Sequence, residues 1–167
     1  MRDGNLLLVA EAVFRPIGTV HTSATIDEIR ARIPGIKSVI EVYPEFEPAL
    51  EGVDGFSHIF VLAYLNQLRP EQVGPLQVKP KAFVHRGLKL EELPTIGVFA
   101  LDSPTRPNPI GLSLVPLLRR EKNLLYVSDL DYFDATPVLD LKPYGPNYRA
   151  EGYTQPDWHT KLVDKVK

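Results

Sequence analysis

HIFVLAYL, residues 58–65, is the stretch that decides the fold. Nearly all of its residues are apolar, which is typical of a strand that is buried on both faces or lines a barrel. Gly52 and Gly55 break the chain in front of it, after a predicted single helical turn at residues 46–50. We therefore expect residues 58–65 to form the central strand of a sheet.

Further strand-like segments lie on both sides of this stretch. They recur about every 10 residues without intervening helices, a spacing that favours a β-barrel or a β-sandwich over a doubly wound sheet. The 16 prolines are about twice the usual share of ~5%, in keeping with many turns and edge strands. We predict a mainly β fold. The predicted strands cover residues 12–21, 38–43, 76–84, 97–101, 111–118, 124–129 and 137–141.

Two segments outside the strands predict helices. Residues 25–28, TIDE, form a capping-box pattern that can satisfy backbone donors at the start of a short helix ending near Arg32. Arg32 itself would be solvated unless a ligand binds it. Residues 156–167 predict a C-terminal helix that docks on the outside of the fold or on a partner. We expect one domain, a barrel over residues 12–145, and a tail over residues 146–167 that is no independent domain.

The composition excludes several kinds of site. The chain has no cysteine, which excludes disulfides, thiolate metal ligands and cysteine nucleophiles. Its formal charge of −2 gives no electrostatic reason to expect nucleic acid, so any RNA contact must be a local patch. The apolar runs, such as residues 6–13, are shorter than the ~18 residues of a membrane span. We expect a cytoplasmic protein without membrane contact.

Several common cofactor motifs are missing from the sequence. No two of the 11 glycines are two residues apart, which opposes the Gly-x-Gly turn of dinucleotide-binding and conventional methyltransferase sheets. The four histidines show neither i, i+4 spacing nor clustered carboxylates, so we expect no metal site. A nucleophile elbow and a Walker loop are also missing.

One segment, which we call the basic strip, departs from an even distribution of charge. No acidic residue occurs between Glu71 and Glu91, although several cationic residues do. Such a strip could face phosphates, or it could be an ordinary solvated surface. The basic strip contains Lys79, Lys81, Arg86 and Lys89.

A proline-rich loop, SPTRPNPIGLS at residues 103–113, could present polar groups to a ligand. Its three prolines fix backbone angles around Arg106 and Asn108, so these residues have little entropy to lose on binding. The alternative is a tight connection between two strands, with Arg106 in solvent.

Polar residues at the ends of predicted strands are further candidates. Asp134 precedes a strand and could accept hydrogen bonds from an amine or a ribose, or cap a turn. Tyr132 and Phe133 beside it could stack on a purine or belong to the core. Asn66 and Gln67 end the central strand, where a barrel would open, or they form a turn.

The string SPTRPNPIGLS, with GFSHIFVL before it and DATPVLDLKPY after it, resembles the TrmO/TsaA family of tRNA methyltransferases. The resemblance runs over residues 14–144. It implies a single-sheet β-barrel, a homodimer and S-adenosylmethionine bound near the dimer interface. It also implies methyl transfer to the exocyclic amine of threonylcarbamoyl-adenosine beside the tRNA anticodon.

The resemblance further implies which residues contact the cofactor. Many relatives carry arginine at the position of Asp102, so the contact implied there has the opposite charge. Relatives often have histidine at Asn66 and glycine at Ala135, and alanine enters the positive-φ region less easily than glycine. The other implied contacts are Ala31, Arg32, Ile33, Gln67, Leu112, Asp134, Thr136 and Pro137.

The implied chemistry requires mainly positioning. The sulfonium is a strong electrophile, so the protein aligns the amine and excludes water. Asp134 could accept the proton of the amine or only hold the cofactor. Arg106, Asn108 and the basic strip would contact the tRNA. Two alternatives stay open, a small-molecule methyltransferase on the same barrel and a non-catalytic S-adenosylmethionine-binding module.

Overall fold

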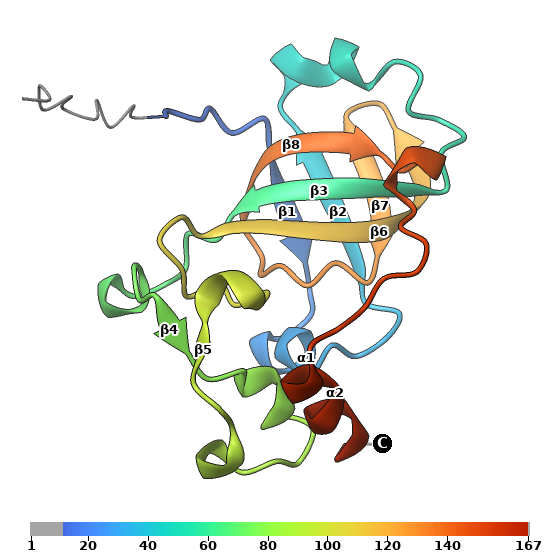
Figure 1. Ribbon diagram of the computed structural model, residues 1–167. Coiled ribbons are helices and arrows are strands. Elements are labelled where there is room, and N and C mark those ends of the chain that lie inside the picture. The colour runs from blue at the N-terminus through green and yellow to red at the C-terminus, as the bar shows by residue number, and fades with distance from the viewer. Residues whose placement is uncertain (1–11, 167) are drawn as a thin grey trace, which may run out of the picture.

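The structure is a computed structural model that describes residues 12–166 of the chain. Within this range six antiparallel strands close a barrel in the order β1-β2-β7-β6-β3-β8 (Figure 1). The predicted mainly β fold is therefore confirmed, as a barrel and not a sandwich. The barrel strands are β1 (Gly18–Thr22), β2 (Lys37–Val42), β3 (His58–Tyr64), β6 (Ile110–Glu121), β7 (Leu124–Ser128) and β8 (Pro137–Pro143).

The apolar stretch at residues 58–65 forms β3, which pairs with β6 on one side and β8 on the other. Ile59, Val61 and Ala63 point into the barrel and are at most 1% exposed. The alternate residues of the strand are half-buried on the outer face, apart from the exposed Tyr64. The strand lines a barrel, and its outward side is also largely apolar.

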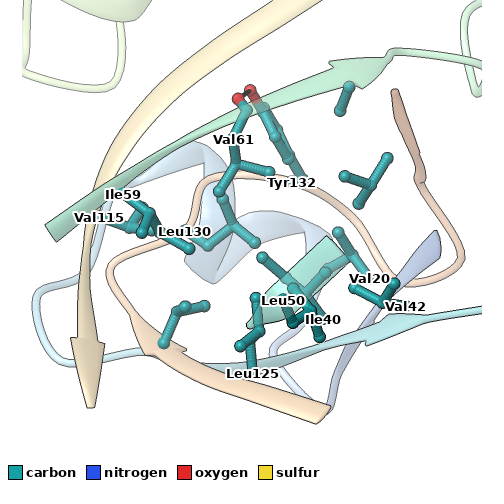
Figure 2. Packing of buried hydrophobic residues seen from close by; sticks show 13 residues of the cluster. Val20, Ile40, Val42, Leu50, Ile59, Val61, Val115, Leu125, Leu130 and Tyr132 are labelled. Atoms are coloured by element: carbon teal, nitrogen blue, oxygen red, sulfur yellow. Dashed lines mark hydrogen bonds between the residues drawn. The ribbon is translucent and has the colours of Figure 1, made fainter. Parts of the chain in front are cut away.

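Branched aliphatic side chains from all six strands fill the barrel (Figure 2). Tyr132 lies among them and donates from its hydroxyl to the Val61 carbonyl oxygen at 3.0 Å. Burial raises the pKa of Tyr132 above its ordinary value. Gly111 makes room for this ring, because a Cβ there would lie 2.8 Å from ring atoms of Tyr132. Tyr132 is therefore a core residue, and stacking on a ligand is not its role.

The two helices lie at one end of the barrel (Figure 1). The predicted capping box opens α1 (Ile26–Arg30): the Thr25 hydroxyl accepts from the Glu28 backbone N–H, and the Glu28 carboxylate accepts from the Thr25 backbone N–H. The bonds that this carboxylate accepts from the backbone N–H and the hydroxyl of Thr25 lower the pKa of Glu28. The helix predicted at residues 156–167 is confirmed as α2 (Asp157–Asp164). Lys167 lies outside the described residues.

A second layer, residues 66–109, fills the connection between β3 and β6. It contains the two-stranded sheet of β4 (Gln77–Val78) and β5 (Ile96–Gly97) and several single turns of 3-10 helix. Phe83 and Leu93 from this layer form a small buried cluster with Leu162 of α2. The C-terminal helix thus docks on its own chain, against the second layer.

Three predicted strands are shorter in the structure than the sequence indicates. Residues 76–84 are strand only at β4, because Pro80 lacks a donor and a 3-10 helix follows it at Lys81–Phe83. In the predicted strand at residues 97–101, Gly97 is the last residue of β5, and Val98–Ala100 form a 3-10 helix. The first strand begins at Gly18, after Pro16.

The predicted turn at residues 46–50 is part of a longer 3-10 helix, Pro44–Leu50. No helix within residues 12–166 is long and apolar enough to cross a membrane. Most of the apolar run at residues 6–13 lies outside the described part of the chain.

Candidate functional site

One loop brings most of the predicted cofactor residues together. It connects β7 to β8 over residues 129–136, which we call the site loop, and it crosses the barrel end nearest α1 (Figure 1). Its three aspartates, Asp129, Asp131 and Asp134, each contact a different neighbouring element. Asp129 fixes the turn after α1, since its carboxylate accepts from the Gly35 backbone N–H at 2.6 Å.

Asp134 joins the site loop to β1 and to the end of β3. Its carboxylate accepts from the Thr22 backbone N–H at 3.0 Å, and its backbone carbonyl accepts from the Gln67 side-chain amide at 2.6 Å. The His21 ring lies beside it, with Nδ1 4.0 Å from Asp134 Oδ1 and Nε2 2.8 Å from a carboxylate oxygen of Glu41. The Asp134 side chain is 61% exposed, so it is oriented and still accessible to a ligand.

The end of the site loop leads into β8. Ala135 has a φ of 61°, in the left-handed region that glycine enters without strain. Its backbone N–H donates to the Val20 carbonyl at 2.8 Å, and the Thr136 carbonyl accepts from the Val20 N–H at 3.0 Å. Thr136 is only 3% exposed, and Pro137 is the first residue of β8. Alanine at residue 135 therefore makes the turn at some cost in strain.

Asp131 connects the site loop to α1 and to β6. One carboxylate oxygen accepts from the Ser113 hydroxyl at 2.5 Å, and the other lies 3.4 Å from the Arg32 guanidinium. Ser113 follows Leu112, whose side chain is 65% exposed on the outside of the barrel. Asp131 and Ser113 were not predicted as site residues from the sequence, although Asp131 stands three residues before Asp134.

The residues predicted next to α1 form the turn that ends this helix. Arg32 has a φ of 50°, and its side chain is 66% exposed apart from the ion pair with Asp131. Ala31 caps the helix, and Ile33 is 47% exposed. All three lie at the same barrel end as the site loop.

Asn66 and the proline-rich loop meet where β3 ends. The Leu65 N–H donates to the Pro109 carbonyl at 2.8 Å, which places the exposed Asn66 and Asn108 near each other along this edge. Leu112 pairs with Leu62 of β3. The loop at residues 103–113 thus enters the same barrel end from the side of β6.

Arg106 serves its own loop. Its guanidinium donates to the carbonyls of Val98 and Leu101 at 3.3 and 3.1 Å, and its own carbonyl accepts from the Gly74 N–H. One nitrogen of the half-buried guanidinium is thus engaged within the loop, and the contact of Arg106 with a substrate stays a prediction. Asp102 is exposed, and the structure gives it no ion pair within residues 12–166.

The basic strip belongs to the second layer and not to the barrel. The Lys79 ammonium donates to the Leu90 carbonyl at 2.9 Å, and the Arg86 guanidinium lies 5.8 Å from the centre of the Phe83 ring. Lys81 and Lys89 are exposed. The strip is thus a surface of the second layer, in the part of the chain that packs on α2 through Phe83 and Leu93.

A hollow of about 530 Å³ adjoins Asp134 and is lined by residues of β1, β2, β6 and β7. Asp134 is the one predicted cofactor residue that lines this hollow. The site loop therefore borders the hollow at Asp134. The polar residues of the lining are His21, Thr22, Ser23, Lys37, Ser38, Arg119, Tyr126 and Asp134. Within the described range, no group of three His, Cys, Asp or Glu residues could hold a metal ion.

The relatives of this chain include S-adenosyl-L-methionine-binding proteins and tRNA methyltransferases. A probable S-adenosyl-L-methionine-binding protein of Pyrococcus abyssi is 35% identical over 160 residues, which cover 92% of this chain and 79% of that protein. A tRNA (adenine(37)-N6)-methyltransferase of Rattus norvegicus is 35% identical over 170 residues, 97% of this chain but 36% of that protein.

A crystal structure of TrmO superposes with a TM-score of 0.67 at 30% identity, covering 89% of this chain and 64% of that one. The chain therefore spans about two thirds of the solved TrmO chain and about a third of the rat protein. The model of the tRNA-methyltransferase O N-terminal domain matches residues 27–150, which include the site loop and the proline-rich loop. By this match over most of its length, the chain belongs to the TrmO family.

Proposed function

We propose that this protein transfers a methyl group from S-adenosylmethionine to the exocyclic amine of an adenine in tRNA. The observation that carries the proposal is the site loop, which joins Arg32, Gln67 and Asp134 at one barrel end in a chain of the TrmO family. The rat relative is named for methylation at adenine 37. The specific substrate we propose is threonylcarbamoyl-adenosine beside the anticodon.

The chemical character of the site residues fits S-adenosylmethionine. This cofactor carries a carboxylate, an ammonium group, a ribose and an adenine, and when bound it supplies an electrophilic methyl group. Arg32 offers a cation and Asp134 an exposed carboxylate, while Leu112 offers an apolar surface. We propose that these residues, with Ala31, Ile33, Asn66, Gln67, Ala135, Thr136 and Pro137, hold it. Asp102 would contribute little to cofactor binding.

Asp134 is the residue we propose for the proton of the amine. An amine that gains a methyl group must lose a proton, and a carboxylate can accept it. The Thr22 N–H holds this carboxylate in place, and the Gln67 amide holds the backbone of the same residue. Asp134 thus keeps one orientation without being removed from solvent, which suits either holding the cofactor or accepting the proton of the amine.

We propose that the basic strip contacts the tRNA backbone. The chain has a formal charge of −2, so RNA binding needs a local surface. Lys81, Arg86 and Lys89 expose their cations on the second layer, and Asn108 lies exposed at the barrel end. Arg106 would act through the shape of its loop. A tRNA substrate also implies a cytoplasmic location.

A homodimer is part of the proposal. The outer face of β3 and β6 exposes large apolar side chains, which a second copy of the chain would cover. Leu112 lies on this face and is also a proposed cofactor contact, which agrees with a cofactor near the interface. The exposed side chains are Tyr64, Leu112, Leu114 and Leu118, at 46%, 65%, 43% and 52%.

The test is incubation with methyl-labelled S-adenosylmethionine and total tRNA, followed by nucleoside analysis. We expect label in N6-methylated threonylcarbamoyl-adenosine, and about 100-fold less with Asp134→Asn. Asp140→Asn is the matched control, because Asp140 is a surface aspartate on β8 that pairs with Lys142. Turnover without RNA would support a small-molecule methyltransferase, and binding without any transfer a non-catalytic module.

A further inference from the structure

Backbone strain is concentrated at the candidate site. Between residues 12 and 166, four residues other than glycine have a positive φ: Arg32, Lys122, Asp129 and Ala135. Lys122 occupies the hairpin turn between β6 and β7, where such a conformation is common. The other three lie in the site loop or in the turn that it holds. Strain that gathers in this way is typical of functional sites.

The strain at Arg32 is the least expected of the three. The Arg32 N–H donates to the Ile29 carbonyl at 3.0 Å and the Ile33 N–H to the Glu28 carbonyl at 3.2 Å, the pattern of a Schellman motif. Arg32 thus stands at the position after the helix cap where glycine is usual. Glycine occupies the next left-handed position, Gly35, at a φ of 84°. An arginine at residue 32 therefore needs a reason other than the helix end.

Asp131 supplies a fixed partner for that arginine. Its backbone lies between the buried Leu130 and Tyr132, which are 1% and 4% exposed. Its carboxylate is held by the Ser113 hydroxyl on one oxygen and faces Arg32 at 3.4 Å with the other. The Asp131 side chain is 34% exposed, against 66% for Arg32. The carboxylate is the anchored member of the pair, and the guanidinium is the member that it directs.

We propose that Asp131 is a positioning residue, which directs the Arg32 guanidinium toward an anionic group of the bound ligand. This inference rests on the proposed function, in which the anion is the carboxylate of S-adenosylmethionine. A guanidinium has five N–H donors in a fixed fork, so one pair with Asp131 leaves donors for a carboxylate. Anchoring one side of the fork lowers the entropy lost when the ligand binds.

The test is a double-mutant cycle read by calorimetry with S-adenosylmethionine alone, without RNA. Asp131→Asn keeps an oxygen for the Ser113 hydroxyl and removes the charge that faces Arg32. We expect Asp131→Asn to weaken binding about fivefold and Arg32→Met about tenfold. The double variant should be no weaker than Arg32→Met, because Asp131 acts only through Arg32. Ser113→Ala should weaken binding less than Asp131→Asn does.

Glycine substitutions separate positioning from a structural role. Arg32→Gly relieves the strained backbone, so it should raise the melting temperature and still weaken cofactor binding. Lys122→Gly relieves the same strain in the remote hairpin, so it should raise the melting temperature and leave binding unchanged. Both effects together support the proposal, whereas binding losses that follow stability in all variants overturn it.

The outcomes also distinguish this inference from the proposed function. Normal binding by Asp131→Asn, or multiplying losses in the double variant, overturns the role of Asp131 and leaves methyl transfer standing. Wild-type binding without transfer to tRNA overturns the proposed function, while the cycle still decides the role of Asp131. Failure of the wild type to bind the cofactor overturns both.

Discussion

The barrel and the second layer are stabilised in different ways. The barrel has a continuous core with side chains from all six strands, and each strand is hydrogen-bonded on both sides. The second layer has two strands of two residues each and a small cluster completed by Leu162, more than sixty residues further along the chain. Most of the proposed cofactor site lies at the barrel end, and the basic strip proposed for RNA lies on the second layer. Binding of the two ligands should therefore respond to different changes.

The largest effect is expected in the barrel core. Ile40→Ala removes a fully buried side chain, so the free energy of unfolding should fall by about 3 kcal/mol, measured by urea denaturation. Leu76→Ala in the second layer is the control, since Leu76 is 67% exposed and should change little. Equal losses in both variants would contradict the tight packing of Ile40 in the barrel core.

Leu162→Ala should loosen the second layer without opening the barrel. The side chain is 5% exposed in the small cluster, so its loss should lower local stability by about 2 kcal/mol. Hydrogen exchange should become faster in residues 81–93 and stay unchanged in β3. Lys161→Ala, an exposed position on the same helix, is the control. Faster exchange in β3 as well would mean that the two regions unfold together.

The double variant Lys81→Ala/Arg86→Ala should separate the two ligands. Loss of two phosphate contacts should make the negative slope of log K against log salt for tRNA less steep by about 1.5. The affinity for S-adenosylmethionine should stay unchanged. Arg15→Ala/Lys142→Ala removes the same charge from the barrel and is the control. An unchanged salt slope would place the RNA elsewhere.

The smallest effect is expected at residue 135. Ala135→Gly relieves a φ of 61°, and after the added freedom of the unfolded chain we expect a gain of about 0.5 kcal/mol. Ala63→Gly in β3 should instead destabilise the barrel, because no positive φ is relieved there. Thermal unfolding measures both. A loss at residue 135 would show that the alanine methyl group makes a packing contribution larger than the strain.

The sequence predicts the barrel strands well because their pattern is local. Residues 58–65 alternate between core and outer face as β3, and the capping box at Thr25 begins α1 where expected. In the second layer the same reasoning fails, because Pro80 and the 3-10 turn after Gly97 end the strands early. The first of these segments packs through Phe83 against Leu162 of α2, a long-range contact that local periodicity does not carry.

The candidate site was only partly predictable for a related reason. The family resemblance marked Arg32, Gln67 and Asp134, which the site loop brings to one barrel end, although their roles in binding stay predictions. It did not mark Asp131 or Ser113, whose pairing depends on the register between the loop and β6. Arg106 was interpreted as a ligand donor or a solvated residue, and the carbonyls it binds could not be inferred from spacing.

The pairing of β1 with β8 has a consequence for dynamics. Within the described residues these strands pair only at Gly18 with Val138 and at Thr19 with Pro137, whereas β3 and β6 pair along seven positions of β3. We expect the barrel to open transiently first at this short β1–β8 pairing, and Pro137 joins the pairing directly to the site loop. Each transient opening there would disturb Asp134 and Ala135 before it reached the core. A ligand held by these two residues would stabilise the pairing of β1 with β8 and slow hydrogen exchange of the Val20 amide.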